Sequence, residues 1–208
     1  MKEKSCAVFY SGGKDGHLSL LKAVNSGYKI SCIINIDGGK KHKSLFNDAK
    51  KILLLKQHAK AMGFPLFIYT ASSSFNPKNI KENFTKIITS ALKKHEFNSV
   101  FIGITEDEIG YRALSELSKE IKVKIMMPIA KKDIFKVIEE CEKLKIKPRI
   151  TGVGKNVNTS WIGKIFNVKV LKYIRKERKK GNFIDGNDFQ TVVIASPLFF
   201  KIKFKSKI

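Results

Sequence analysis

The chain opens with an apolar segment at residues 5–10 (SCAVFY), which stops at Ser-Gly-Gly. A short apolar run that ends at a glycine turn is typical of a buried strand. Beyond the turn, apolar side chains recur at helical spacing over residues 18–24, Gly27 ends the helix, and residues 28–36 (YKISCIINI) form a second apolar run. A strand, a helix and a strand in this order predict two parallel neighbouring strands joined by a right-handed crossover.

The same alternation continues along most of the chain. Further strands are expected at 64–70, 99–104 and 123–127, and further helices at 47–62, 79–95 and 113–120. Strands that alternate with helices in this way predict an α/β fold with an open, doubly wound and mainly parallel sheet.

The pattern is less regular after residue 130. We expect a helix at 133–144, a glycine-rich stretch at 151–156 (TGVGKN), a helix at 162–180 and a last strand at 191–195. The chain is therefore divided into a sheet domain, residues 1–130, and a smaller C-terminal α+β part, residues 131–208.

Lysine dominates the charge of the chain. Its 208 residues include 41 Lys and Arg against 18 Asp and Glu, a formal net charge of +23. Such a charge points to nucleic acid, but the excess is spread over both halves of the sequence, and only four of the 41 are Arg, which phosphate and base recognition favours. The densest patch, residues 172–180 (KYIRKERKK), fits either a solvated helix face or a contact with RNA or an acidic partner.

The apolar segments are too short to cross a membrane. Runs such as 32–36 and 191–195 fall far below the ~20 residues that a bilayer span requires, so no membrane contact is expected. The N-terminal segment reaches Ser-Gly-Gly too soon for a signal peptide, which indicates a cytoplasmic protein. Cys6, Cys32 and Cys141 form no CxxC pair and are expected to be buried thiols.

The turn at residues 10–17 (YSGGKDGH) lies where doubly wound sheets bind ligands, beyond the carboxyl end of a strand. Gly12 and Gly13 let backbone N–H groups approach a phosphate, the helix N-terminus adds its dipole, and Lys14 supplies a cation. The turn has neither the Walker A pattern G-x-x-x-x-G-K-[ST] nor the dinucleotide pattern G-x-G-x-x-G, so ordinary kinases, GTPases and dehydrogenases are disfavoured.

This turn resembles the pyrophosphate-binding loop, usually S-G-G-x-D-S, of the PP-loop ATP pyrophosphatases. That superfamily has a HUP-like α/β fold and splits ATP between its α and β phosphates. Gly16 stands where Ser is usual, which removes one hydroxyl that would contact phosphate. The matching residues are Ser11, Gly12, Gly13, Lys14 and Asp15.

Other segments resemble the diphthine-ammonia ligase branch of this superfamily. Residues 57–66 (QHAKAMGFPL) match its Ala-x-x-Gly-x-Pro-Leu helix end, residues 161–164 (WIGK) its W-L-G-R, and residues 185–199 its acidic C-terminal signature. Gly103 corresponds to a glycine-rich strand end, and Arg112 with Glu116 to an Arg-x-x-x-Glu helix. The C-terminal signature departs from the usual one, because two Asp replace two Glu, and Ile184 and Asn187 replace Gly.

The resemblance implies a reaction, the ATP-dependent amidation of diphthine, the modified histidine of translation elongation factor 2, with free ammonium. Diphthine would form an acyl-adenylate, and AMP and pyrophosphate would be released. The resemblance also implies site residues. Lys14 and Asp15 would be catalytic, and Asp15 would orient Mg²⁺. ATP and pyrophosphate would contact Ser11, Gly12, Gly13, Lys14, Asp15, Gly16, Ile36 and Gly103. The substrate would contact Arg112, Glu116, Trp161, Asp185, Asp188, Phe189 and Thr191.

Several alternatives stay open on the residues alone. Asp185 and Asp188 fit a polar turn before a strand as well as a cation site, Trp161 fits a core position, and residues 37–43 fit a lid over ATP or an ordinary long loop. The protein could also be a PP-loop enzyme that modifies tRNA, although the paired cysteines of thiolating members are missing. A third possibility is a non-catalytic nucleotide-binding protein with a decayed site.

Overall fold

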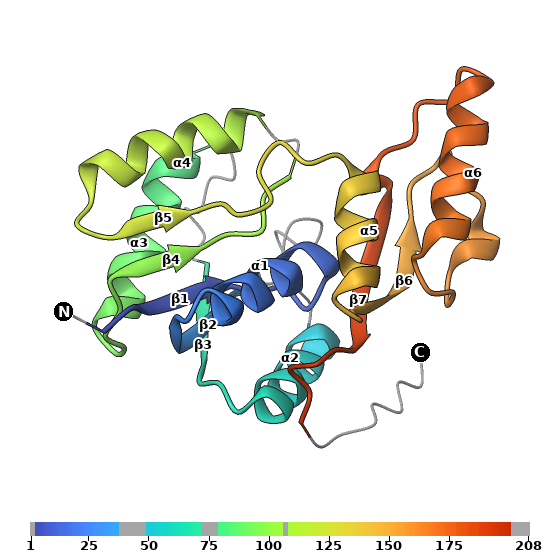
Figure 1. Ribbon diagram of the computed structural model, residues 1–208. Helices are drawn as coiled ribbons and strands as arrows, with labels where there is room; N and C mark the ends of the chain where they lie inside the picture. Colours follow the sequence, from blue (N-terminus) through green and yellow to red (C-terminus); the bar gives the residue numbers. More distant parts are fainter. Residues whose placement is uncertain (1–2, 38–48, 72–78, 106–107, 201–208) are drawn as a thin grey trace.

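The computed structural model describes residues 3–37, 49–71, 79–105 and 108–200. Its centre is a five-stranded sheet in the order β3-β2-β1-β4-β5, and every neighbouring pair is parallel (Figure 1). The predicted doubly wound, mainly parallel α/β sheet is confirmed. The strands are β1 (Ser5–Phe9), β2 (Lys29–Asp37), β3 (Leu66–Thr70), β4 (Ser99–Phe101) and β5 (Lys124–Met126).

Helices cover both faces of this sheet. The helices α1 (Lys14–Asn25) and α2 (Ala49–Met62) pack on one face, and α3 (Ile80–Leu92) and α4 (Glu108–Glu120) pack on the other. Both faces need cover because the apolar side chains of β1 alternate between two cores, one on each side of the sheet. Cys6, Val8 and Tyr10 belong to the core under α1, whereas Ala7 and Phe9 belong to the core under α3 and α4.

The C-terminal part contains α5 (Ile134–Lys143), β6 (Lys147–Val153), α6 (Val168–Lys179) and β7 (Phe189–Ala195). The strands β6 and β7 form a small antiparallel sheet. The last strand was expected, but β6 was not. Its register shifts at Pro148 and again before Gly152, two residue types that are unusual inside strands, although Pro148 and Ile150 are buried in the alternation of a strand.

The expected helix at 162–180 is wrong at its beginning, because α6 starts at Val168. Gly163 has a φ of 85°, and the backbone of residues 163–164 pairs with Ile150 through Gly163 N–H to Ile150 O (2.8 Å) and Ile150 N–H to Lys164 O (2.9 Å). The Asn167 side chain then caps the helix by accepting from Lys169 N–H. The segment matched to W-L-G-R is therefore a turn held by β6.

The C-terminal part packs directly on the sheet domain. Val137, Cys141 and Val193 lie in the same core as α1, and Val193 N–H donates to Gly12 O at 2.9 Å. The predicted boundary at residue 130 lies between β5 and α5, and the division into two domains remains a prediction. Residues 38–43, most of the segment expected as a lid or a long loop, lie outside the described residues.

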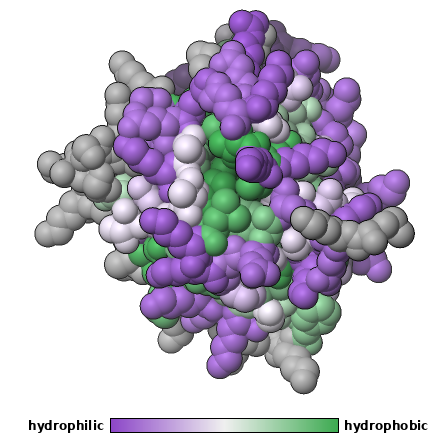
Figure 2. Space-filling view, turned by 90° about the vertical axis from the view of Figure 1, so that its left-hand side faces the viewer, coloured by the Kyte–Doolittle hydropathy of each residue, from purple (hydrophilic) through white to green (hydrophobic). Residues whose placement is uncertain are grey.

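All three cysteines are free and buried, as expected, and burial raises the pKa of each thiol to about 12. Within the described ranges, no helix is long and apolar enough to span a bilayer. The face of the molecule in Figure 2 has apolar surface at its centre, bordered by hydrophilic side chains. A groove of about 540 Å³ lies beside α1, and its lining includes Tyr28, Phe101, Met126 and Leu144.

Candidate functional site

The turn after β1 has the backbone geometry of a phosphate loop. Gly12 has a φ of 81°, in the left-handed region that glycine adopts without strain, and Gly13 is the extended N-cap of α1 without a side-chain cap. The first turn of a helix has N–H groups without intrahelical partners, so it attracts anions. An apolar strand, two glycines and a helix start thus give this turn the features on which the predicted phosphate contacts depend.

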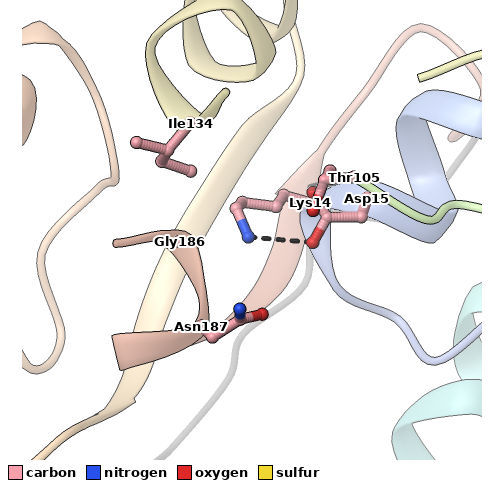
Figure 3. A pocket seen from close by; sticks show the side chains of 6 residues that line it. All are labelled: Lys14, Asp15, Thr105, Ile134, Gly186 and Asn187. Atoms are coloured by element: carbon pink, nitrogen blue, oxygen red, sulfur yellow. Dashed lines mark hydrogen bonds and ion pairs between the residues drawn. The ribbon is translucent and has the colours of Figure 1, made fainter. Parts of the chain in front are cut away.

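The loop lies where the order of strands in the sheet reverses. The chain runs β1, β2, β3 toward one edge and β4, β5 toward the other, so a crevice opens between the carboxyl ends of β1 and β4. A small pocket occupies this position, and residues from both parts of the chain line it (Figure 3). Its lining consists of Lys14, Asp15, Thr105, Ile134, Gly186 and Asn187.

Lys14 and Asp15 form the charged centre of this pocket. Lys14 Nζ lies 2.8 Å from Asp15 Oδ2, and the Lys14 residue is only 5% exposed (Figure 3). The second carboxylate oxygen, Asp15 Oδ1, is buried and accepts no hydrogen bond from the part of the chain that the structure describes. A buried anionic oxygen without a donor is costly, so this atom is poised to bind a cation or a ligand.

Gly103 allows the end of β4 to touch the start of α1. A Cβ atom built on Gly103 would lie 2.4 Å from the backbone oxygen of Asp15 and 2.7 Å from the Gly16 nitrogen. No side chain fits there without moving the loop. Gly16 is less constrained, because its Cβ would lie 3.2 Å from Phe9 O. The predicted ATP residues Gly12, Gly13, Lys14, Asp15, Gly16 and Gly103 therefore come together at one crevice, and Ile36 lies at the carboxyl end of β2, paired with Tyr69.

The strand β7 runs along the loop. Thr191 Oγ1 accepts from Lys14 N–H at 3.2 Å, and a Cβ on Gly13 would lie 3.3 Å from Thr191 O. Together with the Val193 N–H to Gly12 O bond, these contacts connect the C-terminal strand to the phosphate loop. Thr191 was predicted to contact substrate, and in the structure it contacts the loop itself.

Asp185 and Asp188 shape the short turn at Gly186–Asp188, which lines the pocket. Asp188 Oδ2 accepts from Asp185 N–H at 2.9 Å, and Asp185 Oδ1 accepts from Asn187 N–H at 2.7 Å. The Asp185 side chain also accepts from Asp188 N–H, and this bond together with that of Asp185 N–H to Asp188 forms a capping box. Gly154 completes the packing, because a Cβ there would lie 2.5 Å from Asp188 Oδ1. The acidic pair therefore builds the turn that lies opposite Lys14.

The other predicted substrate residues lie in different environments. Arg112 and Glu116 are exposed on α4, and the Glu116 carboxylate lies 3.7 Å from Lys81 Nζ of α3. The Trp161 ring packs 5.3 Å from Tyr173, with Lys164 Nζ 4.9 Å above it. Phe189 is only 3% exposed and packs on Phe166, which is a core position. None of these four residues lines the pocket beside Lys14.

A buried polar network behind the loop was not predicted. The Tyr10 hydroxyl lies 3.0 Å from His17 Nδ1 and 2.7 Å from His58 Nδ1, and His17 Nε2 lies 2.6 Å from Ser196 Oγ. Phe199 packs on both imidazoles, with ring centroids 5.3 and 5.0 Å away. The network joins the end of β1, α1, α2 and the segment after β7.

Burial keeps these histidines neutral. Desolvation, with a smaller contribution from His58, lowers the pKa of His17 to about 3, and desolvation lowers the pKa of His58 to about 4. The same burial raises the pKa of Tyr10 well above its usual value. One signal was present in the sequence, because a helix places His17 on the same face as Leu20 and Leu21.

Comparison with known protein families identifies the family to which this chain belongs. The model of the diphthamide synthase N-terminal domain matches residues 4–125, which is more than half of the chain and includes the loop, Gly103, Arg112 and Glu116. The chain belongs to the diphthamide synthase family. No curated protein sequence matches it significantly. The family match ends before α5, so the C-terminal part lies outside it.

Solved structures share the fold. A predicted subunit of tRNA methyltransferase from Methanocaldococcus jannaschii is similar over 93% of this chain and 98% of its own, with a TM-score of 0.53 and 14% identity. The U34-tRNA thiolase NcsA from Methanococcus maripaludis, with its [4Fe-4S] cluster, is similar over 85% of this chain and 66% of its own, with a TM-score of 0.46 and 18% identity.

A diphthamide synthase of this fold is an ATP-using enzyme of the PP-loop superfamily. The residues at the crevice fit ATP with Mg²⁺. Asp15 Oδ1, which has no hydrogen-bond partner among the described residues, is a hard oxygen ligand of the kind that Mg²⁺ prefers, and Lys14 with the loop backbone supplies positive charge for phosphates.

Proposed function

We propose that the protein amidates the carboxylate of diphthine on translation elongation factor 2, using ATP and free ammonium. The observation that carries this proposal is the Lys14–Asp15 pair at the strand-order reversal, with one buried carboxylate oxygen that receives no hydrogen bond from the described residues. Membership of the diphthamide synthase family supports the choice of substrate.

The chemistry requires activation, because a carboxylate is a poor acceptor for ammonia. The diphthine carboxylate attacks the α-phosphorus of ATP and forms an acyl-adenylate, while the bond from the α-phosphorus to the bridging oxygen breaks and the β and γ phosphates leave as pyrophosphate. Ammonia then attacks the acyl carbon and AMP leaves. The Ser11–Lys14 backbone and Lys14 Nζ stabilise the charge that builds up on the departing pyrophosphate. Asp15 would hold Mg²⁺, which supplies Lewis-acid stabilisation of the phosphate oxygens.

The turn at Gly186–Asp188 supports a substrate site on the other side of the pocket. Diphthine carries a trimethylammonium group, which carboxylates and aromatic rings attract. Gly186 and Asn187 line the pocket, and Asp185 and Asp188 flank them. If this turn holds the trimethylammonium group, the carboxylate of the same diphthine side chain lies near the loop around Lys14.

Product analysis tests the proposal. The protein is incubated with labelled ATP, Mg²⁺, ammonium and elongation factor 2 that carries diphthine, and nucleotides are separated by ion-exchange chromatography. AMP and pyrophosphate, formed only when the diphthine-bearing factor is present, are the expected products. ADP and phosphate as the main products would contradict cleavage between the α and β phosphates.

The basic helix α6 favours one other reaction class, the modification of tRNA by the same ATP cleavage. Unmodified tRNA replaces the elongation factor in a parallel incubation. Release of AMP with tRNA, and not with the factor, would assign the protein to that class. Release of AMP with neither substrate present would leave a nucleotide-binding protein that hydrolyses ATP without an acceptor.

A further inference from the structure

Positive charge is concentrated in one segment of the C-terminal part. Residues 147–183 contain eleven Lys and Arg and a single acidic residue, Glu177, so this segment carries +10 of the net charge of +23. The preceding segment, residues 131–146, contains five Lys and four acidic residues and is nearly neutral. Division of the sequence into halves conceals this contrast.

The helix α6 presents five of these eleven cations to solvent. Its inner face, Val170, Leu171 and Ile174, is buried against α5 and β7. Its outer face consists of exposed cations, and the one acidic residue pairs with Lys180 at 2.7 Å and accepts from Asn182. The exposed cations of the helix are Lys169, Lys172, Arg175, Lys176 and Lys179.

Aromatic rings border this charged face. Phe183, directly after α6, is 83% exposed, and the Arg178 guanidinium lies 5.5 Å from its ring and 5.4 Å from Phe135. At the other border, Trp161 and Tyr173 pack together with Lys164 Nζ 4.9 Å above the indole. Each border thus combines a flat ring with a cation.

These features are unfavourable for the isolated protein. Like charges three and four residues apart on a helix, as at positions 172, 175, 176 and 179, repel each other, and an exposed Phe ring leaves apolar surface in water. A polyanion that carries flat apolar groups would relieve both. An acidic protein surface would neutralise the charge but would leave the rings without a specific role.

We propose that this face, the outer side of α6 with the Phe183 and Trp161–Tyr173 borders, binds single-stranded RNA. Lysines would contact phosphates and the rings would stack on unpaired bases, the combination that single-strand binders use. In Figure 1, α6 lies at the side of the molecule away from the five-stranded sheet, so RNA bound there leaves the crevice beside Lys14 uncovered. The proposal is independent of the amidation reaction.

Fluorescence anisotropy with a short labelled single-stranded RNA of mixed sequence tests it. The variant K172Q/K176Q/K179Q is expected to bind at least about tenfold more weakly and to reduce the slope of log K against log salt by about 2, because each phosphate contact of a single strand contributes about 0.7. The matched control K93Q/K119Q/K122Q removes the same charge from exposed lysines of the sheet domain and should bind like wild type. Circular dichroism verifies that all variants are folded.

A second variant tests the rings. Phe183→Ala removes an exposed side chain and should weaken RNA binding at least about fivefold, the lower end of a base–aromatic stack. Labelled polyglutamate is titrated in parallel and should bind much more weakly than RNA. Equal binding of polyglutamate with no effect of Phe183→Ala would overturn the proposal in favour of an acidic protein partner. An equal loss in the control variant would also overturn it, because the charge would then act without a defined face.

Discussion

Substitution of Lys14 and Asp15 tests whether the loop takes part in catalysis. Lys14→Met and Asp15→Asn keep the size of each side chain, which matters because Lys14 is buried. We expect turnover to fall by a factor that corresponds to about 2 to 4 kcal/mol of transition-state stabilisation for each variant. Release of pyrophosphate, measured with a coupled assay, gives the rate. Rates like that of wild type in folded variants would mean that the loop is only structural.

Gly103 gives a prediction about packing. Gly103→Ala places a methyl group 2.4 Å from the Asp15 backbone oxygen, so the loop must move or β4 must shift. We expect a lower melting temperature, by several degrees for a loss of about 1 to 3 kcal/mol, together with weaker ATP binding.

The control for this prediction is Gly152→Ala, whose methyl group would meet the flexible end of the Gln190 side chain at 3.1 Å. Calorimetry measures the melting temperature and ATP affinity of both variants. A Gly103→Ala protein that melts and binds ATP like wild type would show that the close approach of β4 to α1 is unimportant.

Sequence patterns predicted the residues of the loop better than their neighbours. The turn at Ser11 to Asp15 could be located after β1 because its glycines, its cation and its helix start are contiguous in the chain, and its role toward phosphate stays a prediction. The link from Tyr10 through His17 to Ser196 could not be predicted, because it joins residues 179 positions apart. Phe189, predicted as a substrate contact, is instead 3% exposed because it fills the core beside Phe166.

At the scale of elements, the buried histidines make the attachment of β7 and α2 to the loop sensitive to pH. The pKa of His17 is about 3 and that of His58 about 4, both below the ordinary value of 6.5, so the unfolded chain binds protons more readily. The contribution of the histidines to the free energy of unfolding is therefore constant above about pH 6.5 and falls between about pH 6.5 and 4, by at most about 1.4 kcal/mol per pH unit for each histidine.

Urea unfolding at a series of pH values checks this dependence. His17→Gln keeps a polar group beside Ser196 but cannot titrate, so it should flatten the dependence on pH even if it lowers stability at neutral pH. The opposite result, an unchanged slope in this variant, would mean that other groups cause the acid sensitivity.

Elements with regular apolar patterns were predicted, and elements with local interruptions were not. All five parallel strands follow from apolar runs that alternate with helices, since a doubly wound sheet repeats one unit. The strand β6 contains Pro148 and Gly152, which normally weaken a strand, and its stability comes from pairing with β7. The start of α6 was predicted too early. Gly163 has a positive φ and forms a turn, and the helix begins only after the Asn167 cap.

At the scale of the whole molecule, the proposed site exists only where the two parts of the chain meet. The phosphate loop comes from the sheet domain, and the turn at Gly186–Asp188 comes from the C-terminal part. The strand β7 fixes their spacing through Thr191 and Val193. Nucleotide binding and substrate recognition should therefore be separable by mutation.

Neutral variants of Asp185 and Asp188 should affect substrate recognition without affecting nucleotide binding. Asp185→Asn and Asp188→Asn each keep one side-chain oxygen that can accept a hydrogen bond in the capping box. Each substitution removes one negative charge. If these carboxylates hold the trimethylammonium group, kcat/KM for the diphthine-bearing factor should fall by about tenfold, within the range of a cation contact in a desolvated site. ATP affinity, which depends on the loop around Gly12 and Gly13, should stay close to wild type.

Asp188→Glu is not a neutral way to restore the usual family residue. The Asp188 carboxylate accepts the Asp185 N–H in the capping box, so a side chain longer by one methylene changes the geometry of the cap as well as the reach toward a substrate. The neutral substitutions are therefore the cleaner test, with Glu82→Gln on α3 as a control that removes one charge outside the pocket lining. Steady-state amidation and calorimetric ATP binding are measured for all three. Wild-type kcat/KM in both Asn variants would reject the turn as a substrate site and leave its acids with the structural role of capping it.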